Sequence, residues 1–159
     1  MIPEGTDIPN LAEQLSEDGV AFSNLELAND PSVQSSIESA LQESHGIAVV
    51  DVYPHRLADS RDIAQELQDA TGLDTVIVQT TRNVSAVSDT YSRAAIESAQ
   101  TTIPQGIDQV TLLDQFYSSV DPFGAPWPLI IVGLVIFVTA AAFVAYRATA
   151  KNHDTHVSR

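Results

Sequence analysis

The side chains best suited to chemistry in this chain follow two short apolar runs. His55 and Arg56 come just after a run that ends at Tyr53, and Arg82 with Asn83 follows a second run of the same kind. Open α/β sheets bind ligands at the carboxyl ends of parallel strands, so these positions are candidates for a binding site. The simpler interpretation of His55 is a solvated connecting loop.

The chain lacks the usual catalytic motifs. It has no Cys, which excludes disulfides, thiolate metal sites and a cysteine nucleophile. The patterns G-x-S-x-G, G-x-x-x-x-G-K-S and G-x-G-x-x-G are also missing. His45 precedes Gly46, which we expect to end a helix, so capping or a solvated loop suits His45 better than catalysis. We therefore expect no enzyme, no catalytic residue and no cofactor.

Three carboxylates near the first apolar run raise the question of a metal site. Asp51, Asp59 and Asp62 could offer oxygen ligands to a hard cation. Their spacing matches no calcium-binding loop, and Asp59 and Asp62 are better explained by the start of a helix. We expect no metal site here.

The candidate site is therefore a binding surface. Residues 1–126 hold only four Arg and no Lys, and three of these Arg lie in or beside the two loops. Arg is favoured at protein interfaces because its planar group makes several directed hydrogen bonds. Local pairing with Asp51, Asp59 and Asp62 explains the same arginines equally well. The partner-binding candidates are Tyr53, His55, Arg56, Arg61, Arg82 and Asn83.

The interface hypothesis makes a direct prediction for two of these arginines. Replacing Arg56 and Arg82 together by Glu is expected to abolish partner binding without lowering the melting temperature. Unchanged binding would remove this surface from consideration.

The charge of the chain is large and unevenly placed. The 159 residues carry a net charge of −14, with 21 Asp and Glu against 7 Lys and Arg. Residues 1–126 carry a net charge of −16, from 20 acids and four Arg, and the residues after 146 carry +2, from three bases and Asp154. This balance excludes a nucleic-acid partner, because phosphate binding needs a basic face.

An apolar segment near the end of the chain predicts a membrane span. Residues 128–146 contain no charged side chain, and 19 residues of helix reach ~28 Å, close to the ~30 Å of a bilayer core. Trp127 and Tyr146 are placed as interfacial aromatics. A buried core helix is the alternative, but a helix of this length in a globular protein normally has a polar stripe.

The flanking charges predict the orientation of that span. Arg147, Lys151 and Arg159 follow it, and the nearest base before it is Arg93, so the positive-inside rule places the tail in the cytoplasm. We expect no cleavable signal peptide, because the first thirty residues contain no apolar core segment. A tail anchor with the acidic domain in the cytoplasm is the alternative. The expected organisation is an extracytoplasmic domain over 1–120, a linker over 121–127, the span over 128–146 and a basic tail over 147–159.

The acidic domain itself has the pattern of alternating helices and strands. Apolar spacing predicts helices over 8–16, 31–45, 60–71, 90–100 and 107–120, and strands over 47–53, 75–80 and 84–88. The last two strands form a hairpin with the second arm at an edge, and the first two are parallel through a right-handed crossover. The helix over 107–120 is amphipathic but lacks Lys and Arg, which favours packing on the domain over lying on a membrane. The fold class is an α/β sandwich, a small mixed sheet covered by helices, with one C-terminal transmembrane helix.

The order of these segments resembles a known domain family. HGIAVVDVYP, then DSRDIAQELQDATGLDTVIVQTTRNVSAV, then a helix of the SRAAIESA kind is similar to the TPM domain, over roughly residues 7–100. With the single span and the basic tail, the chain resembles small actinobacterial TPM-like membrane proteins associated with NlpC-type peptidoglycan endopeptidases.

This resemblance implies a regulatory role. It implies a module that binds a cell-wall hydrolase through a helical or coiled-coil regulatory segment of that enzyme and activates it in cell separation. Two other functions stay open: a calcium- or metal-dependent phosphohydrolase of TPM type, and a cytoplasmic tail-anchored adaptor. The bilayer, through residues 128–146, is the second expected partner.

Overall fold

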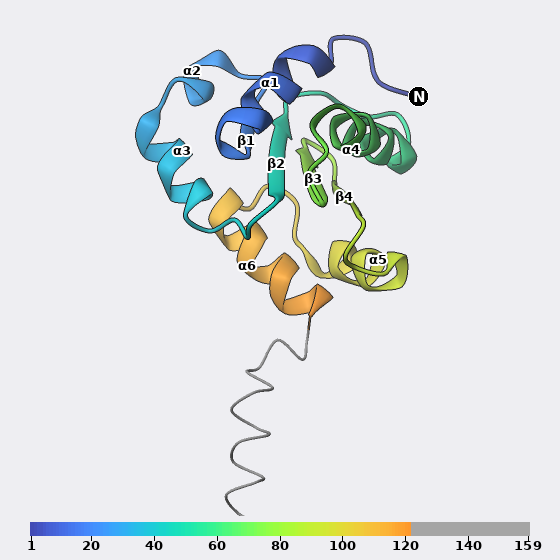
Figure 1. Cartoon of the computed structure of the whole chain (residues 1–159). Helices are drawn as coiled ribbons and strands as arrows, with labels where there is room; N and C mark the ends of the chain where they lie inside the picture. The colour runs from blue at the N-terminus through green and yellow to red at the C-terminus, as the bar shows by residue number, and fades with distance from the viewer. Residues whose placement is uncertain (122–159) are drawn as a thin grey trace, which may run out of the picture. The chain divides into compact units, whose positions relative to one another are not determined.

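The computed structural model describes residues 1–121, in which helices alternate with the strands of one sheet (Figure 1). The predicted span over 128–146 and the tail over 147–159 lie outside these residues. None of the helices within residues 1–121 is long and apolar enough to cross a membrane. The elements in chain order are α1 (Ile8–Asp18), β1 (Val20–Phe22), α2 (Leu25–Ala28), α3 (Pro31–Glu38), β2 (His45–Val50), α4 (Leu57–Thr71), β3 (Thr75–Thr80), β4 (Val84–Ser88), α5 (Arg93–Thr102) and α6 (Gln109–Val120).

The sheet has four strands in the order β1-β2-β3-β4. The first three strands are parallel and β4 is antiparallel to β3. This confirms the parallel pair joined by α4 and the hairpin with β4 at an edge. Sequence patterning missed β1 and α2, because three and four residues are too short to show a period.

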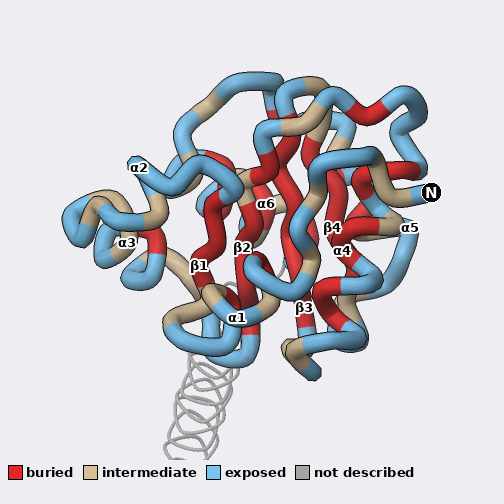
Figure 2. Tube along the Cα trace, turned by 90° about the horizontal axis from the view of Figure 1, so that it is seen from above, coloured by how far each residue is buried: buried red, intermediate tan, exposed pale blue. Residues whose placement is uncertain are grey.

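Helices cover both faces of the sheet, as the buried centre in Figure 2 shows. One core lies against α1 and α4 and contains Leu15, Ile63 and Leu67. The other lies against α3, α5 and α6 and contains Ile37 and Phe116. The expected sandwich of a small mixed sheet between helices is therefore present. Strands β1 and β2 are connected through α3 on one face of the sheet, and β2 and β3 are connected through α4 on the other face. Because the strand order β1-β2-β3 advances in one direction, the two crossover connections have opposite handedness.

Gly46 lies inside β2, which corrects the predicted helix over 31–45. Helix α3 already ends at Glu38, and Gly46 pairs with Val76 of β3. A Cβ atom on Gly46 would lie 2.7 Å from Leu73 Cδ1 and 3.0 Å from Leu15 Cδ2. The glycine is needed because α1 and the start of β3 approach β2 closely, and it does not end a helix.

Other element boundaries also differ from the predictions. Strand β2 begins at His45 and ends at Val50, three residues before the predicted end at Tyr53. Helix α4 begins at Leu57, three residues before the predicted start at residue 60, and α5 spans Arg93–Thr102 where 90–100 is predicted. Ends of elements are the least certain part of a pattern, because caps and first turns carry little periodicity.

His45 is buried at the start of β2, so its predicted place in a helix cap is wrong. Its Nδ1 atom lies 3.1 Å from the hydroxyl of Tyr117 on α6, and that hydroxyl also accepts a bond from the Gln42 amide at 3.3 Å. Burial lowers the pKa of His45, although the nearby charge of Asp74 opposes the shift. Burial also raises the pKa of Tyr117 to about 12. The contact ties the end of α6 to the start of β2.

Stability should therefore fall in mild acid through His45. Because the pKa of His45 is lowered in the folded domain, the unfolded chain binds more protons below pH ~6.5, and the free energy of unfolding decreases as pH falls through this window. In His45→Gln this contribution should disappear, leaving a flatter pH profile between pH ~7.5 and ~5.5. Urea unfolding of the full chain in detergent micelles measures both profiles. Parallel profiles for the two proteins would contradict the assignment.

Helix α6 packs on the domain, as its amphipathic pattern predicts. Leu112, Leu113 and Phe116 are fully buried. Val110, in the first turn of the helix, is 41% exposed, because it lies off the face formed by the buried residues Leu112, Leu113, Phe116 and Val120.

Candidate interaction surface

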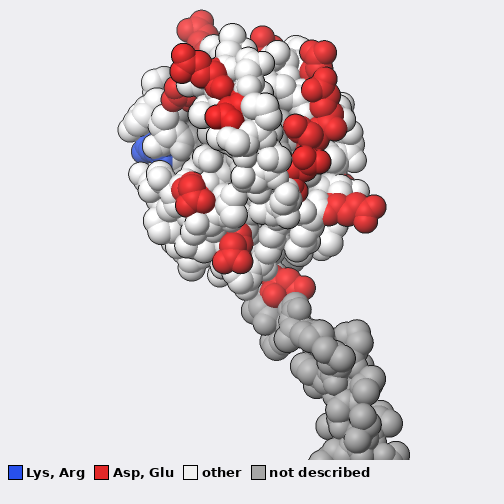
Figure 3. All heavy atoms as spheres, turned by 90° about the vertical axis from the view of Figure 1, so that its left-hand side faces the viewer, with Lys and Arg blue, Asp and Glu red and all other residues white. Residues whose placement is uncertain are grey.

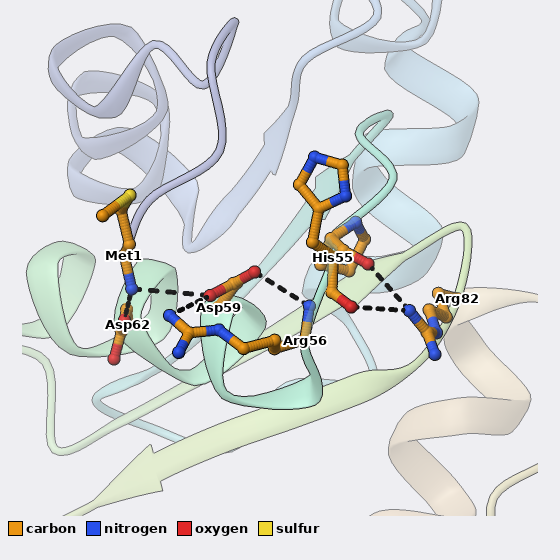
Figure 4. Close-up of polar contacts among 7 residues, drawn as sticks. Met1, His55, Arg56, Asp59, Asp62 and Arg82 are labelled. Atoms are coloured by element: carbon orange, nitrogen blue, oxygen red, sulfur yellow. Dashed lines mark hydrogen bonds and ion pairs between the residues drawn. The ribbon is translucent and has the colours of Figure 1, made fainter.

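The loops that follow β2 and β3 lie at the same end of the sheet, because the two strands are parallel and in register from His45↔Thr75 to Val50↔Thr80. The first loop carries Tyr53, His55 and Arg56, and the second carries Arg82. Figure 4 shows His55, Arg56 and Arg82 around the start of α4. The expectation that both loops lie at the same end of the sheet is confirmed.

Arg82 holds the two loops together. Its Nη1 atom donates to the carbonyl oxygens of Pro54 at 3.1 Å and His55 at 2.9 Å, and its guanidinium carbon lies 5.5 Å from the centroid of the Tyr53 ring. Thr81 adds a bond from its hydroxyl to the carbonyl of Val52 at 2.9 Å. The guanidinium satisfies backbone carbonyls that no strand pairs, and it fixes the aromatic ring by a cation–π contact.

Replacing Arg82 by Ala should loosen this surface without unfolding the domain. We expect the free energy of unfolding to fall by about 1–2 kcal/mol, the range of one or two hydrogen bonds to a charged donor at a partly exposed site. Amide exchange of Arg56, whose amide is bonded to Asp59, should accelerate more than that of β2. Exchange measured by NMR on the full chain distinguishes the two regions. Equal acceleration in both would mean that Arg82 supports the whole fold and not this loop.

Arg56 and Asp59 organise the first turn of α4. The Arg56 amide donates to Asp59 Oδ2 at 2.9 Å, and Arg56 Nη2 lies 3.4 Å from Asp59 Oδ1. The hydrogen bond from the Arg56 amide, together with the Arg56 charge, lowers the pKa of the buried Asp59 carboxyl. The amino group of Met1 contacts Asp59 and Asp62 as well. The local pairing weighed as an alternative therefore exists for Arg56, but 68% of its side chain is still exposed.

Two of the six candidate residues do not join this surface. The Asn83 side-chain oxygen accepts hydrogen bonds from Ser60 at 2.8 Å and Thr80 at 3.1 Å, so it fixes the hairpin turn to α4. Arg61 lines a separate hollow beside β4 and α5. The structure brings together Tyr53, His55, Arg56 and Arg82, which we call the strand-end surface.

The N-terminal segment also borders the strand-end surface, and sequence analysis did not anticipate this. A hollow of about 760 Å³ lies between Met1–Gly5 and the loop that carries Tyr53 and His55. Residues 1–7 show no apolar period that could have placed them there. A second hollow, of about 290 Å³, lies on the other side of Asp51, at the ends of β1, β2 and β3. Both hollows make this end of the sheet concave.

Two of the three carboxylates considered for a metal, those of Asp59 and Asp62, contact the Met1 amino group, and Asp59 also accepts a hydrogen bond from the Arg56 amide at 2.9 Å. Residues 1–121 contain no group of three or more His, Asp or Glu side chains arranged to hold a metal ion.

Charge is segregated within the described domain. Residues 1–55 contain ten Asp and Glu and neither Lys nor Arg, whereas all four Arg of the domain lie between Arg56 and Arg93. Figure 3 views the domain from the side of α2 and α3, where acidic side chains are spread widely and a basic one shows only at the margin. The strand-end surface therefore brings positive groups to an otherwise acidic domain.

Comparison with known proteins places this domain among membrane proteins. A sequence model of the family described as "Membrane protein Rv1476" matches residues 1–158. The match covers nearly the whole chain, so the protein belongs to this family. No curated protein and no solved structure gives a significant match.

Proposed function

We propose that this protein is a membrane-anchored interaction module whose domain binds an NlpC-type peptidoglycan endopeptidase and activates it in cell separation. The observation that carries the proposal is the strand-end surface, where Arg82 holds an exposed Tyr53 and an exposed loop in one arrangement. A surface fixed before binding loses little conformational entropy when a partner docks. Tyr and Arg are the residue types that most often dominate binding energy at such surfaces.

The chemistry of the surface favours a helical partner segment that carries carboxylates. Tyr53 is 66% exposed and offers a broad apolar ring, and Arg56 beside it offers a charged group with several donors. The regulatory segment of the hydrolase, helical or coiled-coil, is the partner that the resemblance to TPM-like proteins implies. A ring packed among the apolar side chains of a helix, with Arg56 paired to an acid on the same helix, uses both groups at once.

The position of the surface also suits presentation to a partner away from a membrane. Tyr117 near the end of α6 contacts His45 at the start of β2, whereas Tyr53 and Arg82 follow the ends of β2 and β3. The point where α6 ends, at Val120, is thus at the opposite end of the sheet from the strand-end surface (Figure 1). A partner bound at the strand-end surface therefore does not contact the end of α6 at Val120.

The proposed topology has residues 128–146 across the membrane, the domain outside and the tail in the cytoplasm. Protease added to intact spheroplasts should digest residues 1–120 and leave an epitope attached after residue 159 protected. Protection of the domain, with loss of the terminal epitope, would instead establish the tail-anchored cytoplasmic adaptor and overturn the proposal.

The regulatory claim is tested by the activity of the enzyme. Purified full chain in detergent micelles should increase cleavage of peptidoglycan by an NlpC-type endopeptidase that carries its regulatory segment. The same enzyme without that segment should not respond. No change in cleavage by the intact enzyme would refute activation.

A further inference from the structure

The two edge strands of the sheet, β1 and β4, differ in how their outward backbone groups are hydrogen-bonded. At the β1 edge, the Gln14 side chain on α1 accepts a hydrogen bond from the Phe22 amide at 2.9 Å and donates one to the Phe22 carbonyl at 3.1 Å. Asp18 accepts a bond from the Val20 amide at 2.9 Å. The β1 edge is therefore closed by side chains, which prevents pairing with another strand.

The β4 edge has no comparable closure. The Thr80 amide donates to the Asn83 carbonyl at 2.9 Å and the Asp89 amide donates to the Asp74 carbonyl at 2.9 Å. In an antiparallel pair such bonded positions alternate, so the register places the backbone groups of Ser85 and Val87 toward β3 and those of Ala86 away from it. Within residues 1–121, the amide and carbonyl of Ala86 have no hydrogen-bond partner.

These free backbone groups border a hollow whose charged lining residues are Arg61, Arg93 and Glu97. The hollow has a volume of about 100 Å³, and Ala86, which is 3% exposed, is one of its lining residues. Arg61 of α4 and Arg93 of α5 are on its lining, and both are exposed. Arg93 is paired with Glu97 at 2.7 Å, while Arg61 makes no ion pair within the described residues. Buried backbone groups without partners cost free energy, so a ligand that supplies both bonds gains it.

We propose that the open edge of β4 binds an extended peptide segment of a partner protein, which pairs with the backbone of Ala86 and places a carboxylate between Arg61 and Arg93. Strand addition of this kind takes its affinity from the main chain and its specificity from neighbouring side chains. The size of the hollow admits one residue of the segment beside Ala86, and the two arginine side chains are long enough to move aside at its rim. This surface is separate from the strand-end surface and does not depend on the function proposed for it.

Charge decides between a partner segment and a second copy of this chain. Pairing of two β4 strands about Ala86 brings the arginines of both copies together, and each domain carries −16 over residues 1–126. Like charges placed against each other oppose that association. A segment with one carboxylate among uncharged β-branched residues meets the arginines without adding much to the acidic repulsion.

The test uses two synthetic peptides with blocked ends, Thr-Val-Glu-Val-Thr and Thr-Val-Lys-Val-Thr, and the full chain in detergent micelles. At millimolar concentration the Glu peptide should slow amide exchange of Ala86 by roughly tenfold, while the amides of Ser85 and Val87, already bonded to β3, should not change. The Lys peptide should bind roughly tenfold more weakly. An unchanged Ala86 amide with the Glu peptide would overturn the proposal.

Two variants complete the test. Arg61→Glu with Arg93→Glu should reverse the preference, so that the Lys peptide binds better than the Glu peptide. Ala86→Pro should remove binding while keeping the β3–β4 ladder, because it deletes only an outward amide. If Ala86→Pro does not fold, the charge reversal still decides. An unreversed preference, or protection of Ala86 that rises with protein concentration in the absence of peptide, would overturn the proposal, the latter in favour of a second copy.

Discussion

Phe116→Ala should lower the free energy of unfolding by about 3–5 kcal/mol, the cost of emptying a fully buried aromatic site in a core that cannot collapse around it. Phe116 is 0% exposed and lies edge-on to Tyr91, with ring centroids 6.3 Å apart. A domain of this size has only about 5–15 kcal/mol of stability, so the variant should be close to unfolding at 37 °C. Urea unfolding of the full chain in micelles, followed by the tyrosine circular dichroism signal, measures the change.

The matched control lies on the same helix. Val110→Ala removes apolar atoms from a side chain that is 41% exposed, and should change stability by less than about 0.5 kcal/mol. A small effect of Phe116→Ala, similar to that of Val110→Ala, would mean that α6 is not part of the core. The distinction matters for function, because α6 is the last element of the domain before the linker and the proposed span.

Tyr53→Ala combined with Arg56→Glu should weaken binding to the NlpC-type endopeptidase by about 100-fold. Each of these residue types costs more than about 1 kcal/mol when removed from the centre of an interface, and two such losses of about 1.4 kcal/mol each make a factor of 100. The melting temperature should change little, because both side chains are largely exposed. Binding is measured with the full chain immobilised in nanodiscs.

Charge alone must be excluded as the cause. Ser35→Glu with Ser36→Glu lowers the net charge by the same two units at exposed positions of α3, and should leave binding within about twofold because charges far from a contact are screened. Equal weakening by both pairs of substitutions would contradict a specific role for the strand-end surface. The pair Arg56→Glu with Arg82→Glu is less suitable, because Arg82 holds the loop through two backbone carbonyls and its loss is expected to destabilise the fold.

The long elements of this fold were predictable because each shows a period and a clear stop. The β-branched run over Thr75–Thr80 and the glycine at 72, which ends α4 in a left-handed conformation, identify β3 and α4 correctly. His45 and Gly46 were misplaced because a glycine after a polar residue suggests a helix end, whereas here it serves the close packing of Leu15 and Leu73. Such a tertiary contact leaves no local signal.

The candidate site was partly predictable for the same reason. Parallel strands place the residues that follow them at the same end of the sheet, so Tyr53, Arg56 and Arg82 could be grouped from the order of the predicted strands alone. The sequence could not show that the Arg82 side chain donates hydrogen bonds to the carbonyls of Pro54 and His55, or that the Asn83 side chain accepts one from Ser60. The sequence also could not show which residues of β4 point their backbone amide and carbonyl groups away from β3, because that depends on which pairs of the antiparallel ladder are hydrogen-bonded.

The most direct test of the central claim is site-specific photocrosslinking in intact cells. A photoreactive amino acid in place of Tyr53 should form an adduct that contains an NlpC-type endopeptidase, and the same group in place of Glu26, on the acidic side of the domain, should not. An adduct of equal yield from both positions, adducts with cytoplasmic proteins alone, or no adduct from position 53 would contradict the account.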